Sequence, residues 1–274
     1  MRQPFANVRR AALLVPGALA LAGLVLLILG CNLATSANAQ MRDPRAPPGL
    51  DPGGVAVALA AIEGIDYLQP QIASRLARDG EGEPIAWDFV DGDPHPYAVD
   101  GKASEVVKTL LREAPASRLV YLRTVIETRT LGQTVAFAGQ SPARVLVIAA
   151  RSPRAEDWAA FQEAARFFAH LLIIVPVSTG PGPHFPASLA LDNLLTVVPA
   201  NAAAPLSEVA RGPPADIAVP LPSSPAVGRA DAAAPAAPGL IAAARVAALA
   251  ARVLETEPDL AGAALKARVL ALAR

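Results

Sequence analysis

The chain has 274 residues, of which 53% are hydrophobic but only 4% aromatic, and its 24 basic and 24 acidic residues give a formal net charge of zero. That length holds one domain with a full hydrophobic core and a short terminal segment besides. The balanced charge lacks the basic excess of a nucleic-acid-binding protein, so we expect no nucleic-acid partner.

The first 39 residues have the pattern of an export signal. Three arginines precede an apolar run over residues 11–30, and Ala37-Asn38-Ala39 is a small-x-small sequence of the kind that signal peptidase cuts. The run is also long enough for an uncleaved membrane anchor. Cys31, the single cysteine, stands in a sequence that loosely resembles a lipoprotein box. We therefore predict an exported protein, periplasmic or secreted, whose N-terminal segment is cleaved, lipidated at Cys31 or retained in the membrane.

Residues 40–54 are rich in Pro and Gly and read as a linker, so residues 55–274 are predicted to form the domain. Short apolar runs within it predict buried strands. These runs cover residues 55–62, 119–127, 143–150, 170–178 and 193–200.

Helical patterns alternate with these runs. Residues 103–114 have one apolar face, and so do residues 155–169, where Ser152-Pro153 supplies the start signal. Two alanine-rich helices end the chain, split at Glu257-Pro258-Asp259, whereas residues 201–239 read as loop. Continuous apolar strands separated by amphipathic helices predict an α/β fold of three layers, with a mostly parallel central sheet and helices on both faces.

The order of these segments resembles that of the subtilases, the subtilisin-like serine proteases. The sequences that carry the resemblance are AIEGIDYLQPQI, WDFVDGDPHPYAVDG, FFAHLLIIVPVSTG, FPASLALDNLLTVVPAN, PADIAVP and the C-terminal helical region from GLIAAARVAALAARVL onward. They run from about Val55 to Ala273 and stand in the family's order. The resemblance implies a subtilisin-like fold for the whole domain.

In the family an Asp orients a His, the His takes a proton from a Ser, and the Ser attacks the substrate. The resemblance places these three roles at Ile62, Lys102 and Leu240, the motif's second His at Glu105 and the oxyanion Asn near Gly180. Isoleucine cannot orient a base and leucine cannot attack a carbonyl. We therefore predict a degenerate triad, and hence a pseudoprotease rather than an enzyme.

A pseudoprotease keeps its cleft, so its expected function is to bind a peptide or a protein partner in the cell envelope. In active relatives the substrate adds a strand to the cleft edges through main-chain hydrogen bonds, which need no triad. Two alternatives stay open: a serine-type peptidase with a relocated nucleophile, and a structural envelope protein. For a relocated nucleophile, Ser223 and Ser224 stand about fifteen residues before the helix. A Ser104/Lys102 dyad is also conceivable, but the two side chains diverge because they are two residues apart at a helix start.

The remaining polar residues give weaker signals. His95, His170 and His184 do not follow a glycine at a helix start and read as loop residues. The four aspartates at 88, 91, 93 and 100 cluster near one turn, where they would suit calcium or form a solvated acidic turn. We favour the turn and predict neither a metal nor a cofactor.

Lys102 itself, next to Gly101 at a helix start, raises a question of charge. A buried ammonium would need a carboxylate partner, and the candidates are Glu63, one residue past Ile62, and Glu105, three residues along the helix from Lys102. We predict that Lys102 is a structural cation paired with Glu63. The alternative is a lysine whose stem packs over Ile62 while its ammonium reaches solvent.

Overall fold

A computed structural model describes residues 44–99, 101–177, 184–200, 215–221 and 237–273, and Asp43–Arg274 form one compact unit. The predicted export signal, Gly180, Asp100, Ser223 and Ser224 lie outside the described residues. None of the described helices is both long and apolar enough to cross a membrane.

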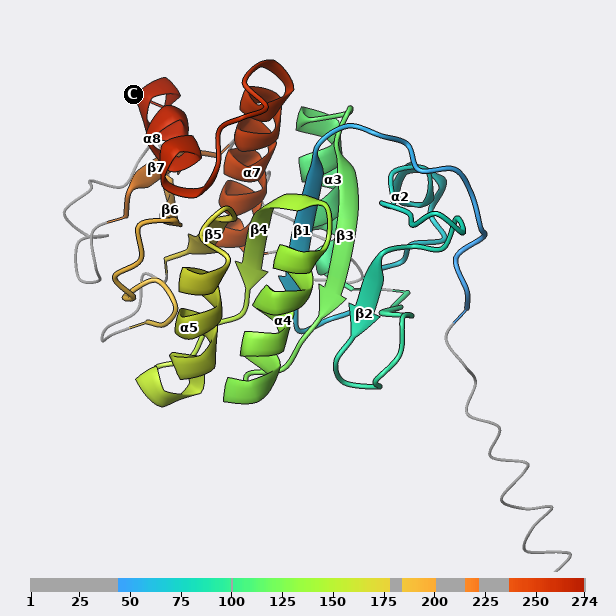
Figure 1. The fold of residues 1–274 in the computed structure, drawn as a ribbon, viewed down its shortest axis with the longest axis horizontal. Coiled ribbons are helices and arrows are strands. Elements are labelled where there is room, and N and C mark those ends of the chain that lie inside the picture. The colour runs from blue at the N-terminus through green and yellow to red at the C-terminus, as the bar shows by residue number, and fades with distance from the viewer. Residues whose placement is uncertain (1–43, 100, 178–183, 201–214, 222–236, 274) are drawn as a thin grey trace, which may run out of the picture. The chain divides into compact units, whose positions relative to one another are not determined.

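A single seven-stranded sheet forms the centre of the domain (Figure 1). Every strand pairs in parallel with its neighbours, in the order β2-β3-β1-β4-β5-β6-β7. The strands are β1 (Ala56–Ala61), β2 (Ala86–Asp88), β3 (Arg118–Arg123), β4 (Ala143–Ala149), β5 (Leu172–Pro176), β6 (Leu194–Ala200) and β7 (Ile217–Pro220). The predicted parallel α/β fold is confirmed.

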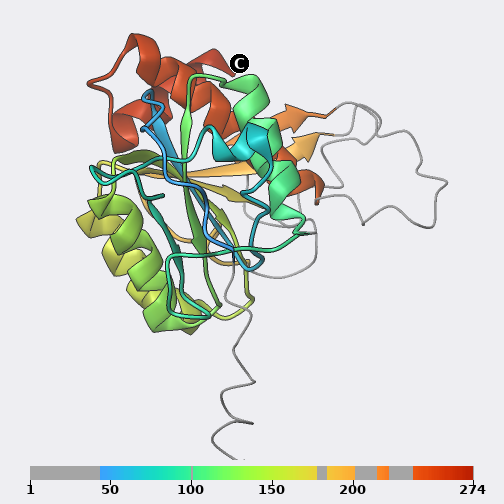
Figure 2. The same ribbon diagram turned by 90° about the vertical axis from the view of Figure 1, so that its right-hand side faces the viewer.

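Helices cover both faces of this sheet (Figure 2). On one face the core includes α3, α7 and α8, and on the other it includes α4 and α5. The helices are α2 (Pro70–Ala73), α3 (Ala103–Glu113), α4 (Thr128–Gln140), the 3-10 turn η1 (Ala155–Trp158), α5 (Ala159–Phe167), α7 (Pro238–Thr256) and α8 (Gly262–Leu272).

Alternation along the strands divides the apolar residues between the two faces. In β1, for example, Val57 and Leu59 enter the core under α3 and α7, whereas Ala58 and Ala60 enter the core under α4 and α5. This is the period of two that an extended chain imposes. Strands buried on both faces therefore read as continuous apolar runs.

Several elements differ from the expectations, and the short α2 and β2 were not predicted. The strand predicted to continue to residue 127 ends at Arg123, and the chain turns at Thr124, whose hydroxyl meets that of Thr134 at 2.9 Å. The helix α4 was not predicted. The region 201–239, read as loop, includes β7, which corresponds to the PADIAVP segment.

Candidate functional site

The residues predicted to hold the three triad roles lie on segments that reach one edge of the sheet, where the strands end. Ile62 follows β1 directly and is 46% exposed. Lys102 is exposed and precedes α3 as its N-cap residue. Leu240 lies in the first turn of α7, half-buried against the core that α3 also contacts. The carboxyl ends of parallel strands are where ligand sites of open α/β sheets are found.

The loop after β1 and the start of α3 are held together by two glycines. A Cβ atom on Gly101 would lie 2.1 Å from the carbonyl oxygen of Gly64, and one on Gly64 would lie 2.6 Å from the carbonyl carbon of Tyr97. Neither position has room for a side chain. This close approach explains the glycine that precedes Lys102.

Glu63 joins the same two segments through hydrogen bonds. Its Oε2 accepts the backbone N–H of Lys102 at 2.8 Å, and its carbonyl oxygen accepts the hydroxyl of Tyr121. Ser104 adds a third link, because its Oγ accepts the backbone N–H of Asp66 at 3.1 Å. The carboxylate of Glu63 thus satisfies a free N–H group at the start of α3, where negative charge is favoured.

The predicted pairing of the Lys102 ammonium with a carboxylate is wrong for both proposed partners. Glu63 binds the main-chain N–H of Lys102, not its ammonium, and Glu105 forms its ion pair with Lys108 at 3.0 Å. The side chain of Lys102 is exposed. Ser104 is only 4% exposed and bonded to the preceding loop, so it has a structural role.

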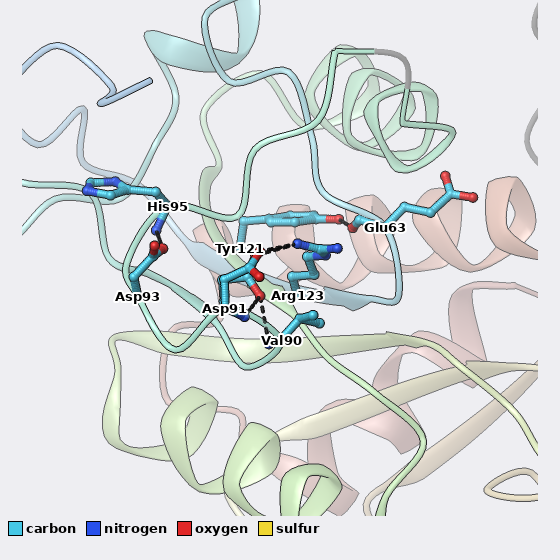
Figure 3. Close-up of polar contacts among 8 residues, drawn as sticks. Glu63, Val90, Asp91, Asp93, His95, Tyr121 and Arg123 are labelled. Carbon is cyan, nitrogen blue, oxygen red and sulfur yellow. Dashed lines mark hydrogen bonds and ion pairs between the residues drawn. The ribbon is translucent and has the colours of Figure 1, made fainter. Parts of the chain in front are cut away.

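Tyr121 and Arg123, two polar residues of β3, complete the polar contacts at this edge (Figure 3). Burial raises the pKa of the Tyr121 phenol well above its ordinary value, and the Glu63 carboxylate raises it further against the opposing effect of Arg123. Sequence reasoning missed both residues. The sequence signal that could have found them is their i, i+2 spacing, which places both side chains on one face of the strand. A tyrosine on such a buried face also needs an acceptor for its hydroxyl.

Arg123 binds two aspartates, Asp88 at the end of β2 and Asp91 in the turn that follows. Its Nη1 lies 2.9 Å from a carboxylate oxygen of the buried Asp88 and 2.8 Å from one of Asp91. Burial alone would lower the pKa of Arg123, but these two carboxylates outweigh it and raise that pKa. Asp93 accepts the backbone N–H of His95 at 2.8 Å. In the described part of the chain, no three His, Cys, Asp or Glu side chains are grouped so that they could hold a metal ion.

The histidines contribute to loops, as their sequence context predicts. His170 stands before β5, at the edge of the sheet opposite the candidate site, and its ring meets Phe168 edge-on at 6.1 Å. His184 accepts the hydroxyl of Ser188 on its carbonyl oxygen at 3.0 Å.

Comparison with known proteins rests on structure alone, because neither protein-family models nor curated proteins match this chain. The chain superposes on a lanthipeptide protease with a TM-score of 0.60 and 17% identity, over 81% of this chain and 80% of that one. It also superposes on MycP1 from which the N-terminal propeptide was removed. The TM-score is 0.55 and the identity 19%, over 77% of this chain and 82% of that one. The fold is subtilisin-like.

A third subtilisin-like structure agrees with this assignment. The MycP3 protease of the type VII (ESX-3) secretion system superposes with a TM-score of 0.52 and 16% identity, over 84% of this chain and 86% of that one. At such low identities the superpositions show the fold only. The predicted resemblance to subtilases is therefore confirmed as a likeness of fold.

The prediction that this protein is not an enzyme is corrected by the same comparisons. The neighbours that share its subtilisin-like fold are proteases, and the domain has a peptidase-like fold. No finding shows that the catalytic residues are missing. The placement of triad roles at Ile62, Lys102 and Leu240 stays a prediction from sequence resemblance.

Proposed function

We propose that this domain binds an extended polypeptide at the carboxyl edge of its sheet, beside the junction of Glu63, Gly64, Gly101 and Lys102. The observation that carries the proposal is apolar surface on this junction. Ile62 is 46% exposed and Val99 is 61% exposed, and each lies within two residues of a junction glycine. Exposed apolar surface that is held in a fixed arrangement is typical of an interaction site.

The junction is rigid enough to present these side chains. Ile65 and the Pro96–Ala98 segment exchange backbone hydrogen bonds of 3.0 and 3.1 Å, which ties the loop after β1 to the loop that carries Val99. A partner peptide then meets preformed surface and loses little free energy to ordering of the protein. Main-chain hydrogen bonds to the loops of the junction, of the kind formed when a peptide binds as an added strand, would supply the affinity.

Hydrolysis of the bound peptide is the second candidate function. It is favoured by the comparisons, because the structures on which the chain superposes are proteases. In this reading the nucleophile is a serine outside the predicted Leu240 position. Export and a partner in the cell envelope belong to the same proposal, supported by the N-terminal pattern over residues 1–39.

Binding of a fluorescent peptide library, followed by polarisation, tests the proposal. Ile62→Asp and Val99→Asp each place a charge in the apolar contact, so we expect Kd to rise about tenfold, equivalent to about 1.4 kcal/mol. Phe167→Asp is the matched control. Phe167 is 82% exposed at the end of α5, which leads to the opposite edge of the sheet, so its substitution leaves Kd unchanged.

The result that would overturn the proposal is an equal effect of all three variants, or no binding by the wild type. A serine-directed fluorophosphonate probe separates the two candidates in the same samples. A covalent adduct together with cleavage of the bound peptide establishes the peptidase, whereas binding without an adduct leaves the binding function alone. A folded protein that does neither is a structural protein.

A further inference from the structure

The segment before β1, predicted to be a linker, contacts the domain at both of its ends. At its beginning, the carbonyl oxygen of Pro44 accepts the hydroxyl of Tyr67, and Ala46 is only 5% exposed in the core. Gly49 then donates its N–H to the carbonyl of Gly82 at 3.1 Å. Figure 1 shows the segment in blue, passing α2 on its way to β1. We refer to residues 44–51 as the N-terminal clamp.

Asp51 fixes the other end of the clamp. Its carboxylate lies 2.6 Å from Nη1 of Arg118 and accepts the backbone N–H groups of Gly53 at 2.7 Å and of Arg78 at 2.9 Å. Partial burial would raise the pKa of Asp51, but these hydrogen bonds and the Arg118 cation outweigh it and hold the pKa below its ordinary value. Arg118 begins β3, so this anchor lies at the amino edge of the sheet.

From Pro44, contacts lead through two aromatic residues to the candidate site. Tyr67, 4% exposed, meets the ring of Tyr97 edge-on with centroids 5.1 Å apart. The backbone of Tyr97 lies so close to Gly64 that a Cβ there would be 2.6 Å from it. Gly64 in turn contacts Gly101, next to Lys102. The backbone contacts at Gly64 and Gly101 have no room for a side chain, and tightly packed groups transmit displacement.

We propose that the N-terminal clamp is a positioning element for the peptide site, which it holds through Tyr67 and Tyr97. Its effect on peptide affinity rests on the function proposed above, but its effect on the junction does not. Releasing Pro44 from Tyr67 removes one of the contacts that hold the Tyr67 ring against Tyr97, and the loop that carries Gly64 is then held less firmly. The N–H groups of Lys102 and Asp66 report on that loop, because each donates across the junction.

Amide hydrogen exchange in the full chain tests the proposal. Tyr67→Phe keeps the ring and removes the hydroxyl bond to Pro44, and Asp51→Asn weakens the opposite anchor. In both variants we expect exchange at Lys102 and Asp66 to accelerate about two- to tenfold, the range for one lost hydrogen bond. Thr134→Val is the control, because it removes a buried hydroxyl of α4, on the other face of the sheet, that donates to the carbonyl oxygen of Thr130 and meets the hydroxyl of Thr124.

Peptide binding by the same variants separates this proposal from the proposed function. Faster exchange at the junction with Kd raised confirms both, and faster exchange in a protein that binds no peptide confirms the clamp alone. Exchange at Lys102 and Asp66 that stays at the wild-type rate in folded Tyr67→Phe overturns the clamp. Acceleration that is equal at the junction and beneath α4 also overturns it, because the clamp would then only add general stability.

Discussion

Glu63 is the residue on which the candidate site depends most, because it contacts both β3 and α3. Its carbonyl accepts the Tyr121 hydroxyl and its carboxylate accepts the Lys102 N–H. A side chain that caps a helix start in this way contributes through a main-chain donor, so the identity of residue 102 is of little consequence for the contact.

This distinction gives a matched pair of substitutions. Glu63→Ala removes the carboxylate that accepts the N–H of Lys102 at the start of α3, and we expect the free energy of unfolding to fall by about 1 kcal/mol. Lys102→Met keeps the donor and exposes no buried charge, so its effect stays within about 0.5 kcal/mol. Urea unfolding measures both. A loss for Lys102→Met as large as that for Glu63→Ala would show that the ammonium, not the N–H group, carries the contact.

Tyr121 makes the stability of the domain sensitive to alkaline pH. Its pKa is raised in the folded state by burial and by Glu63, so above the ordinary tyrosine pKa, about 10, the unfolded chain loses this proton before the folded one does. The stabilising contribution of the neutral phenol is complete below pH 10 and is lost as pH rises towards the folded pKa.

The measurement is unfolding of the wild type and Tyr121→Phe between pH 8 and pH 11. Below pH 10 we expect Tyr121→Phe to be less stable by about 1 kcal/mol, the value of the hydroxyl bond to Glu63. Above pH 10 the difference in stability shrinks by up to about 1.4 kcal/mol per pH unit. The reason is that Tyr121 ionises in the unfolded wild type but not in the folded one, and the Phe variant has no such group. A difference that is constant with pH would contradict the raised pKa.

At the scale of elements, a helix or strand is predicted from the sequence when its apolar pattern agrees with the intrinsic conformational preference of its residues. The helix at α3 was predicted from its apolar face, and the structure buries that face. The helix α4 was missed because Thr and Gly, which favour helix weakly, are frequent in TRTLGQTVAFAGQ. It is helical because Leu131, Val135 and Ala138 pack on the sheet, and a tertiary contact of this kind overrides local preference.

The sequence placed the segments of the candidate site but not the contacts within it. Ile62, Lys102 and Leu240 were assigned from the order of motifs, and that order follows the fold. The atoms that meet at the junction were not predictable, because a carboxylate that reaches Lys102 can accept its backbone N–H as readily as its ammonium. Nor does a Pro- and Gly-rich segment reveal that Asp51 within it is bound to Arg118, a residue 67 positions further along.

The contact between the loop after β1 and α3 sets a steric limit that substitution tests. Gly101→Ala places a methyl group 2.1 Å from the Gly64 carbonyl oxygen, so backbone must move, and we expect a loss of about 1–3 kcal/mol. Gly80→Ala is the control, because a Cβ there would meet nothing within 4 Å. Its effect should stay within about 0.5 kcal/mol or be slightly stabilising. Equal losses in denaturant unfolding would mean that the two backbones are not in close contact.

At the scale of the whole molecule, one sheet serves two cores. The five strands β1, β3, β4, β5 and β6 supply side chains both to the core under α3 and α7 and to the core under α4 and α5. A helix layer that detached would leave one face of every central strand in water, where their alanine, valine, leucine and isoleucine side chains are costly. Neither layer is therefore expected to persist without the other.

This arrangement predicts that damage to either core weakens one common unfolding transition. Leu110 is 2% exposed on α3 and Leu131 is fully buried on α4, on opposite faces of the sheet. Leu110→Ala and Leu131→Ala each remove buried methyl groups and leave a cavity, with an expected loss of about 2–5 kcal/mol. For a domain of this size each kcal/mol lowers Tm by about 2–4 °C. Calorimetry should show a single peak in the wild type and in both variants, shifted down by a similar amount. If either variant instead splits the peak in two, or moves only part of it, then the faces unfold separately and the shared sheet does not couple them.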